Sequence, residues 1–274
     1  MPFCARFATN GQLRCTGVQV RTPSGMVTVR VKADVILSAG SIGSPQVLQL
    51  SGIGLAALLQ QPGVPVLHDA PGVGTNLQDH LQIRTVDKVQ GVKTLNVQPL
   101  SLEAFGEPLH RFATFTASVC NLHPSSRGSV QIRSPDFSVA TSIAPNDLST
   151  EADCQVAADS LRLTRTIVAQ PAQANFQPQE FKPGGQYQSD ADLARLAGDI
   201  ATTIFHSGGR TKIGRADDPL AVLDSHLRVR GPGGLIAGLR VVDAGAMPVI
   251  TSSNTNSPTL MMAEKAARWI AAGM

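Results

Sequence analysis

Residues 206–214, HSGGRTKIG, place three glycines and two cations directly after a histidine. Glycines beside a lysine could form a phosphate-binding loop, whereas the histidine could exchange a proton with a substrate near neutral pH. Phosphate-binding loops have the pattern G-x-x-x-x-G-K-[ST] and dinucleotide-binding loops the pattern G-x-G-x-x-G, and the sequence contains neither. The spacing therefore argues against phosphate binding and favours proton exchange by His206 as the function of this segment.

A second candidate site lies just before the last helix. Asn254 and Asn256 precede Ser257, which can cap the helix, and Pro258, which can open it. Because a helix N-terminus carries unpaired N–H groups and a partial positive charge, an anion at Pro258 and Thr259 would be favoured. Together with the histidine, this segment forms half of a redox or acid–base site. The same residues also suit a structural loop histidine and ordinary helix caps, and pattern alone does not decide.

Composition limits the possible partners. The chain has 274 residues, of which 42% are apolar, so it can bury a sizeable core as one large domain or two unequal ones. Lys and Arg number 23 against 20 Asp and Glu, with few aromatic residues and no run of like charges. This pattern predicts no nucleic-acid binding and favours a small-molecule substrate.

Cysteine spacing and hydropathy indicate the cell compartment. Cys4, Cys15, Cys120 and Cys154 are far apart, which predicts four unpaired buried thiols rather than a zinc site or a disulfide framework. No apolar run approaches the roughly 18 residues of a membrane span, and the first residues do not resemble a signal peptide. We therefore expect no metal, no membrane span and a cytoplasmic location.

The first part of the chain has the pattern of an α/β sheet. Residues 18–31 alternate apolar and polar around the turn Thr22–Gly25, which predicts a hairpin. ADVILSAG, residues 33–40, predicts a strand buried on both faces. A helix should follow, with Ser44 as its cap, Pro45 at its first position and a stop at the glycines of residues 52–54.

The rest of the chain is less regular until its end. Residues 55–69 predict a short helix and strand, and residues 72–80 a polar loop. A separate subdomain is expected next, with a strand at 128–134, a helix at 157–169 and a linker at 170–188. An α/β pattern then returns, with strands near 227–230 and 239–245. In the last helix we expect an apolar stripe of Leu260, Ala263, Ala267 and Ile270. We also expect an ion pair between Glu264 and Arg268.

Five segments together resemble the glucose-methanol-choline (GMC) oxidoreductases, flavoproteins that oxidise alcohols. They are GSIGSPQVLQLSGIG (40–54), PGVGTNLQDHL (71–81), HPSSRGSVQIRS (123–134), LSTEADCQVAADSLRLTR (148–165) and LRVVDAGAMPVITSSNTNSPTLMMAEKAA (239–267). The first matches the second signature of the family, and all five occur in the order of the family.

The resemblance implies an active site. HSGGRTKIG occupies the place of the family segment H-x-x-G-T-x-x-M-G, so His206 is expected to be the catalytic histidine. The second asparagine of NTNSPT matches the family's second His or Asn, so Asn256 rather than Asn254 is the expected partner. His206 would take the alcohol proton while a hydride passes to flavin N5, and Asn256 would hydrogen-bond the substrate oxygen.

The resemblance also implies that FAD is the cofactor and that oxygen or a quinone accepts the electrons. Arg127 is expected to be architectural, and Gln78 to belong to a loop beside the flavin. The expected cofactor-binding residues are Asn76, Asp79, His80, Asp243, Ala244, Asn254, Pro258 and Thr259.

The implied fold is α/β to α+β, comprising a partial Rossmann-like FAD-binding domain that lacks its N-terminal βαβ unit and a reduced substrate-binding subdomain. We expect residues 1–85 and 206–274, the latter with the histidine segment, to belong to the FAD-binding domain. Residues 86–205 would form the substrate-binding subdomain, shortened between about Val97 and Thr116.

Departures from the family favour a truncated half of an alcohol-oxidising enzyme. The match begins midway through a typical member, and the sequence lacks the G-x-G-x-x-G loop that grips the ADP half of FAD. Ser207, Arg210 and Ile213 replace the usual Pro, Thr and Met. Two alternatives stay open: a noncatalytic remnant or binding half that needs a partner chain, and a flavin-containing hydroxynitrile lyase.

Overall fold

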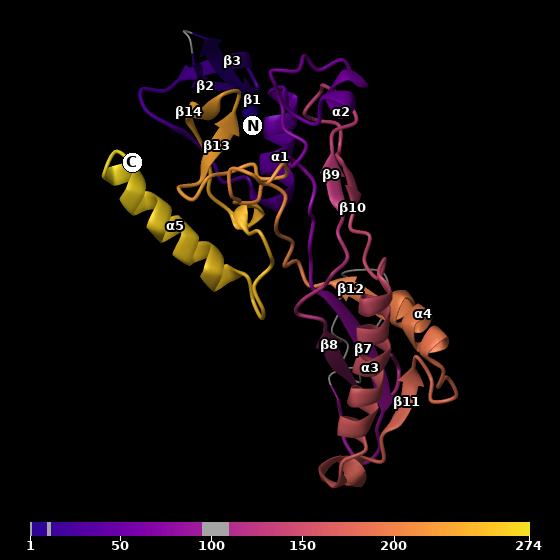
Figure 1. Ribbon diagram of the computed structural model, residues 1–274. Coiled ribbons are helices and arrows are strands. Elements are labelled where there is room, and N and C mark those ends of the chain that lie inside the picture. The colour runs from indigo at the N-terminus through magenta and orange to yellow at the C-terminus, as the bar shows by residue number, and fades with distance from the viewer. Residues whose placement is uncertain (1, 10–11, 95–109) are drawn as a thin grey trace. The chain divides into compact units, whose positions relative to one another are not determined.

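The computed structural model describes residues 2–9, 12–94 and 110–274 (Figure 1). Its helices and strands form a mixed α/β fold with two compact units. The first unit contains residues 1–79, 127–146 and 206–274, and the second contains residues 80–126 and 147–205. Most of the segment that we expected to be shortened, between Val97 and Thr116, lies outside the described residues.

A six-stranded sheet is the centre of the first unit. Its strands are β1 (Pro2–Thr9), β2 (Leu13–Thr22), β3 (Gly25–Arg30), β4 (Val35–Leu37), β13 (Arg228–Gly231) and β14 (Gly234–Val241). β2 and β3 form the predicted hairpin, and β14 runs parallel to both β2 and β4. Strands from the two ends of the sequence thus meet in one sheet.

β4 is shorter and more exposed than the sequence predicted. It has three residues, and Ile36 in its centre is 45% exposed. Alternate side chains of a strand point to opposite faces, and here only Val35 and Leu37 reach the core. The prediction of a strand buried on both faces is therefore wrong.

The following helix, α1 (Gly40–Leu50), begins earlier than predicted, so Ser44 and Pro45 lie inside it and do not form its start. It ends before Gly52, whose φ of 83° gives the left-handed conformation common after a helix C-terminus. The predicted helix and its stop are confirmed, but its cap is not.

The remaining elements of the first unit are short apart from the last helix. They are β5 (Ile53–Gly54), α2 (Ala56–Gln60), β6 (His68–Asp69), β9 (Ser129–Gln131), β10 (Ser142–Ala144), the 3-10 turn η3 (Ala244–Ala246) and α5 (Asn256–Ala271). Residues 127–146, which we had placed in the middle subdomain, lie in the first unit. The reason is visible at Gln49 of α1, whose side chain bonds the backbone of Val130 and Ile132.

In α5 the buried face differs from the predicted stripe. Leu260 is 61% exposed, whereas Ala266 is 1% exposed and Met262, Ala263 and Trp269 pack against the core. The helix also begins at Asn256, with Thr255 as its N-cap, so Ser257 is not the cap. The predicted ion pair of Glu264 with Arg268 is present at 3.0 Å.

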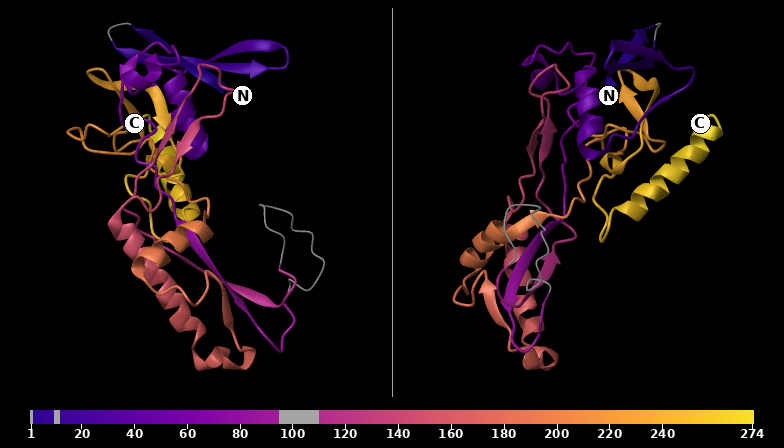
Figure 2. Two further views of the ribbon diagram at one scale, coloured as in Figure 1. Left: turned by 90° about the vertical axis from the view of Figure 1, so that its right-hand side faces the viewer. Right: turned by 180° about the vertical axis from the view of Figure 1, so that it is seen from behind.

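The second unit is a four-stranded antiparallel sheet with two helices. The strands are β7 (Leu81–Lys88), β8 (Thr114–Cys120), β11 (Gln179–Lys182) and β12 (Ala201–Thr203). The helices α3 (Glu151–Val168) and α4 (Asp190–Ile200) cover one face of the sheet (Figures 1 and 2). A core separate from that of the first unit forms there, around Ile83, Leu161 and Leu193.

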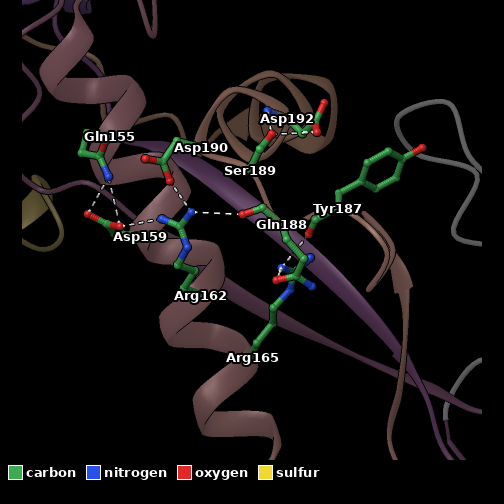
Figure 3. A network of polar contacts seen from close by, with 9 residues as sticks. All are labelled: Gln155, Asp159, Arg162, Arg165, Tyr187, Gln188, Ser189, Asp190 and Asp192. Carbon is green, nitrogen blue, oxygen red and sulfur yellow. Dashed lines mark hydrogen bonds and ion pairs between the residues drawn. The ribbon is translucent and has the colours of Figure 1, made fainter.

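Residues 170–188 are not the linker that their composition suggested. They form the 3-10 turn η2 (Pro171–Phe176) and strand β11, and Arg165 of α3 binds both carboxylate oxygens of Glu180, at 2.7 and 2.9 Å. Arg162 of α3 bonds Asp159, Asp190 and the carbonyl of Gln188 (Figure 3). Side-chain contacts with α3 thus order a segment whose residues have little intrinsic preference for a helix or a strand.

The described cysteines are unpaired, as predicted, but only Cys15 is buried. Burial raises the pKa of the Cys15 thiol, which keeps it protonated and unreactive. The side chain of Cys4 lies outside the described residues. Across the described ranges, none of the helices has the length and apolar character needed to span a bilayer.

Candidate active site

The loop of residues 72–80 holds two distant segments of the first unit together. Asn76, with a φ of 59°, donates from Nδ2 to the carbonyls of Gly209 and Pro248 at 3.0 and 3.2 Å. Gln78, 1% exposed, pairs its backbone with Gly208 and its side chain with Pro248 and Ile250. The expected flavin loop therefore has a clear structural task, which is to fix the histidine segment against residues 248–250.

His206 stands at the start of the segment that this loop fixes. Its backbone N–H donates to Asp79 Oδ1 at 3.0 Å, and its side chain is half-buried. Gly209 has a φ of 92°, and a Cβ at this position would lie 2.6 Å from the carbonyl oxygen of Asn76. The close approach of the two segments therefore requires glycine here.

Asn254 is in contact with the ring of His206. Its Nδ2 lies 3.1 Å from His206 Nε2, while its Oδ1 accepts the backbone N–H of Asn256 at 2.8 Å. An amide nitrogen donates, so the contact suits the tautomer of the ring that has its lone pair on Nε2. The asparagine that the structure brings to His206 is thus Asn254, and Asn256 contributes its backbone to holding that asparagine in place.

Asp243 closes the turn after β14 and caps α1. Its Oδ2 accepts from the Gly40 N–H at 3.0 Å and from Ser44 Oγ at 2.6 Å, and its Oδ1 accepts from the Gly245 N–H at 2.8 Å. A carboxylate at a helix N-terminus is stabilised by unpaired N–H groups and by the helix dipole. The cap of α1 is therefore supplied from 203 residues away along the chain.

The other predicted cofactor residues use their polar groups within the chain. The carbonyl of Ala244 accepts from the Gly209 N–H at 3.2 Å. At the start of α5, Thr259 bonds Thr255 through both its N–H and its hydroxyl, and Pro258 has no N–H to offer. An anion at this helix start would therefore meet few of the N–H groups that the sequence predicts there.

His80 belongs to the second unit. Its ring is fully buried, and Nε2 lies 3.3 Å from the carbonyl oxygen of Leu122. This contact gives the ring a structural role within that unit. Arg127 donates to Asn76 Oδ1 at 3.0 Å, in keeping with the architectural role expected for it.

Arg210 is a feature that spacing could not reveal as important. It is 0% exposed, and its three guanidinium nitrogens are without a hydrogen-bond partner in the described part of the chain. Burial lowers its pKa to about 10, and the charges of Asp243 and Asp79 oppose this shift. Thr211 Oγ1, the neighbouring side-chain oxygen, is also buried without a partner.

The donors of Arg210 and Thr211 are buried without a partner among the described residues. Leaving such donors unpaired costs about 1–3 kcal/mol each and more for a charged group. Because both side chains are 0% exposed, a cofactor cannot reach them without a rearrangement of the fold. His206, which is half-buried, and Asn254, which is exposed, are accessible to a cofactor.

Comparison with known proteins identifies the family of the chain. Family models described as GMC oxidoreductase match residues 3–82 and 124–263. The chain belongs to the GMC oxidoreductase family. It is 34% identical over 302 residues to oxygen-dependent choline dehydrogenase 1 of Chromohalobacter salexigens, covering 93% of this chain and 53% of that relative. An oxygen-dependent choline dehydrogenase of Pseudomonas fluorescens is 36% identical, with 88% and 50% covered.

Solved structures show the same relationship. Pyridoxine 4-oxidase from Mesorbium loti superimposes with a TM-score of 0.83 at 28% identity, covering 97% of this chain and 56% of that one. An FAD-dependent oxidoreductase from Chaetomium thermophilum has a TM-score of 0.85 at 21% identity, covering 98% and 60%, and shows the shared fold alone. This GMC oxidoreductase chain thus spans about half the length of the curated relatives that it matches.

Proposed function

We propose that this protein takes part in the FAD-dependent oxidation of an alcohol to an aldehyde or ketone. The observation that carries the proposal is the contact between His206 Nε2 and Asn254 Nδ2, on backbone fixed by Asp79. FAD, when bound, supplies the acceptor for the hydride that leaves the carbinol carbon. The similarity to choline dehydrogenases and to pyridoxine 4-oxidase supports this class of reaction.

In the proposed mechanism, His206 Nε2 takes the proton of the alcohol hydroxyl. Asn254, already beside that nitrogen, donates a hydrogen bond to the substrate oxygen as negative charge develops on it. Asp79 holds the backbone of His206, so the ring meets the substrate without reorganising. Asn254 replaces Asn256 in this role because Asn254 is the residue in contact with the ring.

For the cofactor, we propose that it binds beside His206 and Asn254, whose side chains are accessible. The first unit would then be the partial Rossmann-like, FAD-binding portion, and the second unit the substrate-binding portion. We further propose that a complete site needs a segment carrying a dinucleotide-binding loop, on a longer polypeptide or a partner chain. Support for this comes from the lack of G-x-G-x-x-G in the 274 residues and from the greater length of the relatives.

The experiment begins with the visible spectrum of the chain purified with excess FAD. If flavin is bound, primary alcohols are added without oxygen and bleaching of the flavin is followed. We expect His206→Ala to slow bleaching at least about 100-fold, as for loss of a general base. If the chain is colourless, the same assay is made with the chain joined to, or co-expressed with, the N-terminal half of a relative.

Other results would support other functions. Bleaching that His206→Ala leaves unchanged would contradict the proposed mechanism. If flavin binds but no alcohol bleaches it, while a cyanohydrin is cleaved, the protein would be a lyase. If neither form binds flavin, the chain would be a noncatalytic remnant or binding half.

A further inference from the structure

The sheet of the second unit has one face that its helices do not cover. Ile83 faces the core under α3 and α4, so its neighbours on β7, Arg84 and Gln82, point to the opposite face. The strand register places Arg84 opposite Ser118 and Val86 opposite Thr116. Arg84 Nε donates to Gln82 Oε1 at 2.8 Å, which holds the guanidinium on this open face.

A pocket of about 580 Å³ lies among these residues. Its polar lining consists of Arg84, His110, Thr116, Ser118, Lys182 and Asp199. Two of these side chains are cations at neutral pH, and the carboxylate of Asp199 bonds Arg195 at 3.2 Å. The lining thus combines excess positive charge with hydroxyl donors, the combination that binds oxyanions.

Aromatic rings beside the pocket already hold a cation. Lys88 Nζ lies 4.7 Å from the ring centroids of both Phe112 and Phe181. The two rings are perpendicular to one another, and His110 stacks on Phe112 at 5.1 Å. Clustered rings of this kind are the usual site for a quaternary ammonium group. Here the ammonium of Lys88 occupies them, so an added cation would meet both this charge and those of Arg84 and Lys182.

We propose that this pocket binds a small carboxylate or a similar oxyanion rather than a quaternary ammonium. Arg84 and Lys182 bind the anion through charge-assisted hydrogen bonds, and Ser118 and Thr116 add neutral donors. This proposal does not depend on the proposed function.

The test uses three alcohols of similar size: 3-hydroxypropionate, choline and 3,3-dimethylbutan-1-ol, which is choline without its charge. Each is titrated into the full flavin-free chain at low salt, and the backbone amide signals of β7, β8 and β11 are followed by NMR. We expect saturable shifts with 3-hydroxypropionate, at about tenfold or more lower concentration than with the neutral alcohol, and weaker binding still of choline.

Substitutions of single residues test which side chains bind the anion. Arg84→Gln and Lys182→Gln should each weaken binding of 3-hydroxypropionate about tenfold, whereas Lys182→Arg should retain it. The control, Arg215→Gln, removes the same charge from an 87% exposed side chain in the first unit and should change nothing. Amide signal dispersion confirms that each variant is folded.

Two results would overturn the proposal: choline shifting the same signals at an equal or lower concentration, or binding of 3-hydroxypropionate that neither glutamine variant weakens.

Discussion

At the scale of single residues, the candidate site depends on one contact between two side chains. Asn254 is held by the N–H of Asn256 through its oxygen, so its nitrogen is directed at His206. This arrangement fixes the position of the amide before any substrate arrives, and fixed donors stabilise developing charge better than mobile ones. The two neighbouring asparagines are therefore expected to differ sharply in their effect on catalysis.

We predict that Asn254→Ala slows flavin bleaching by an alcohol about 10- to 100-fold, the usual effect of removing one hydrogen bond made in the transition state. Asn256→Ala should stay within about threefold of the parent, because only its backbone N–H takes part in the contact. Single-turnover kinetics of the flavin-loaded protein measures both. If Asn256→Ala slowed the bleaching more than Asn254→Ala, Asn256 would be the catalytic asparagine, as the resemblance implies.

Arg210 gives a prediction about stability. Replacing a buried, unpaired charge by an apolar side chain of similar size is commonly neutral or stabilising. We therefore expect Arg210→Met to raise the free energy of unfolding of the flavin-free chain by about 1–3 kcal/mol in urea titrations. A loss of stability instead would show that Asp79 and Asp243 depend on this cation in the folded chain.

The sequence predicted that His206 lies near the asparagines before α5, but it did not predict which asparagine contacts the ring or that Arg210 is buried. Asn254 and Asn256 are separated by one residue, and their side-chain directions depend on how the backbone enters α5. Arg210 differs from the family pattern, yet nothing in its neighbours along the sequence indicates burial without a partner. Both facts arise from contacts between segments that are far apart along the chain.

At the scale of elements, α3 is held at its start by a carboxylate inside the helix. Asp153 accepts from the N–H groups of Ser125 and Ser126 at 2.9 and 2.7 Å, and from Asn121 Nδ2 at 3.2 Å. Thr150 caps the helix by accepting the Asp153 N–H. Burial alone would raise the pKa of Asp153, but the hydrogen bonds from these serines outweigh burial and lower it.

This shift predicts how stability depends on pH. A carboxyl group whose pKa is lower in the folded chain stabilises the fold above its unfolded pKa, and that contribution is lost as the pH falls through the folded pKa. We expect Asp153→Asn to cost about 1–3 kcal/mol at pH 7, measured by urea unfolding. The difference from the parent should shrink as the pH falls below about 4. A difference that is constant across this range would contradict the assignment.

The sequence pattern correctly predicted the features that are determined by residues close together in the sequence. The hairpin of β2 and β3 was found because its turn residues determine it, and the ion pair in α5 because it lies within one helix. The start of α1 was misplaced because its cap is Asp243, on a distant segment. The prediction of the buried face of α5 was wrong for a related reason. Apolar residues lie on several sides of that helix, and only its packing against the core determines which side is buried.

At the scale of the whole molecule, the second unit is built from two stretches of a chain whose other stretches form the first unit. Both points where it joins the first unit are closed by hydrogen bonds. The Ser149 N–H donates to Ser126 Oγ at 3.0 Å, and the Ile204 N–H donates to the His80 carbonyl at 3.3 Å. The unit also has its own core. It therefore has the features of an independently folding domain.

We predict that residues 80–126, joined to residues 147–205 by a short glycine linker, fold without the rest of the chain. The expected evidence is a dispersed amide NMR spectrum and a cooperative thermal transition. Asp153→Asn in this fragment serves as a control and should lower the transition temperature. An unfolded fragment would show that the core around Leu161 and Leu193 is insufficient alone.

The sheet of the first unit has a consequence for synthesis. β4 ends at Leu37, but β14, the strand with which it pairs, begins at Gly234. At typical rates of about 5–20 residues per second, a ribosome needs on the order of 10–40 s to make the chain between them. During that time the early strands carry unpaired backbone groups that can join other chains. The yield of native protein should therefore depend on chaperones that bind the nascent chain in this interval.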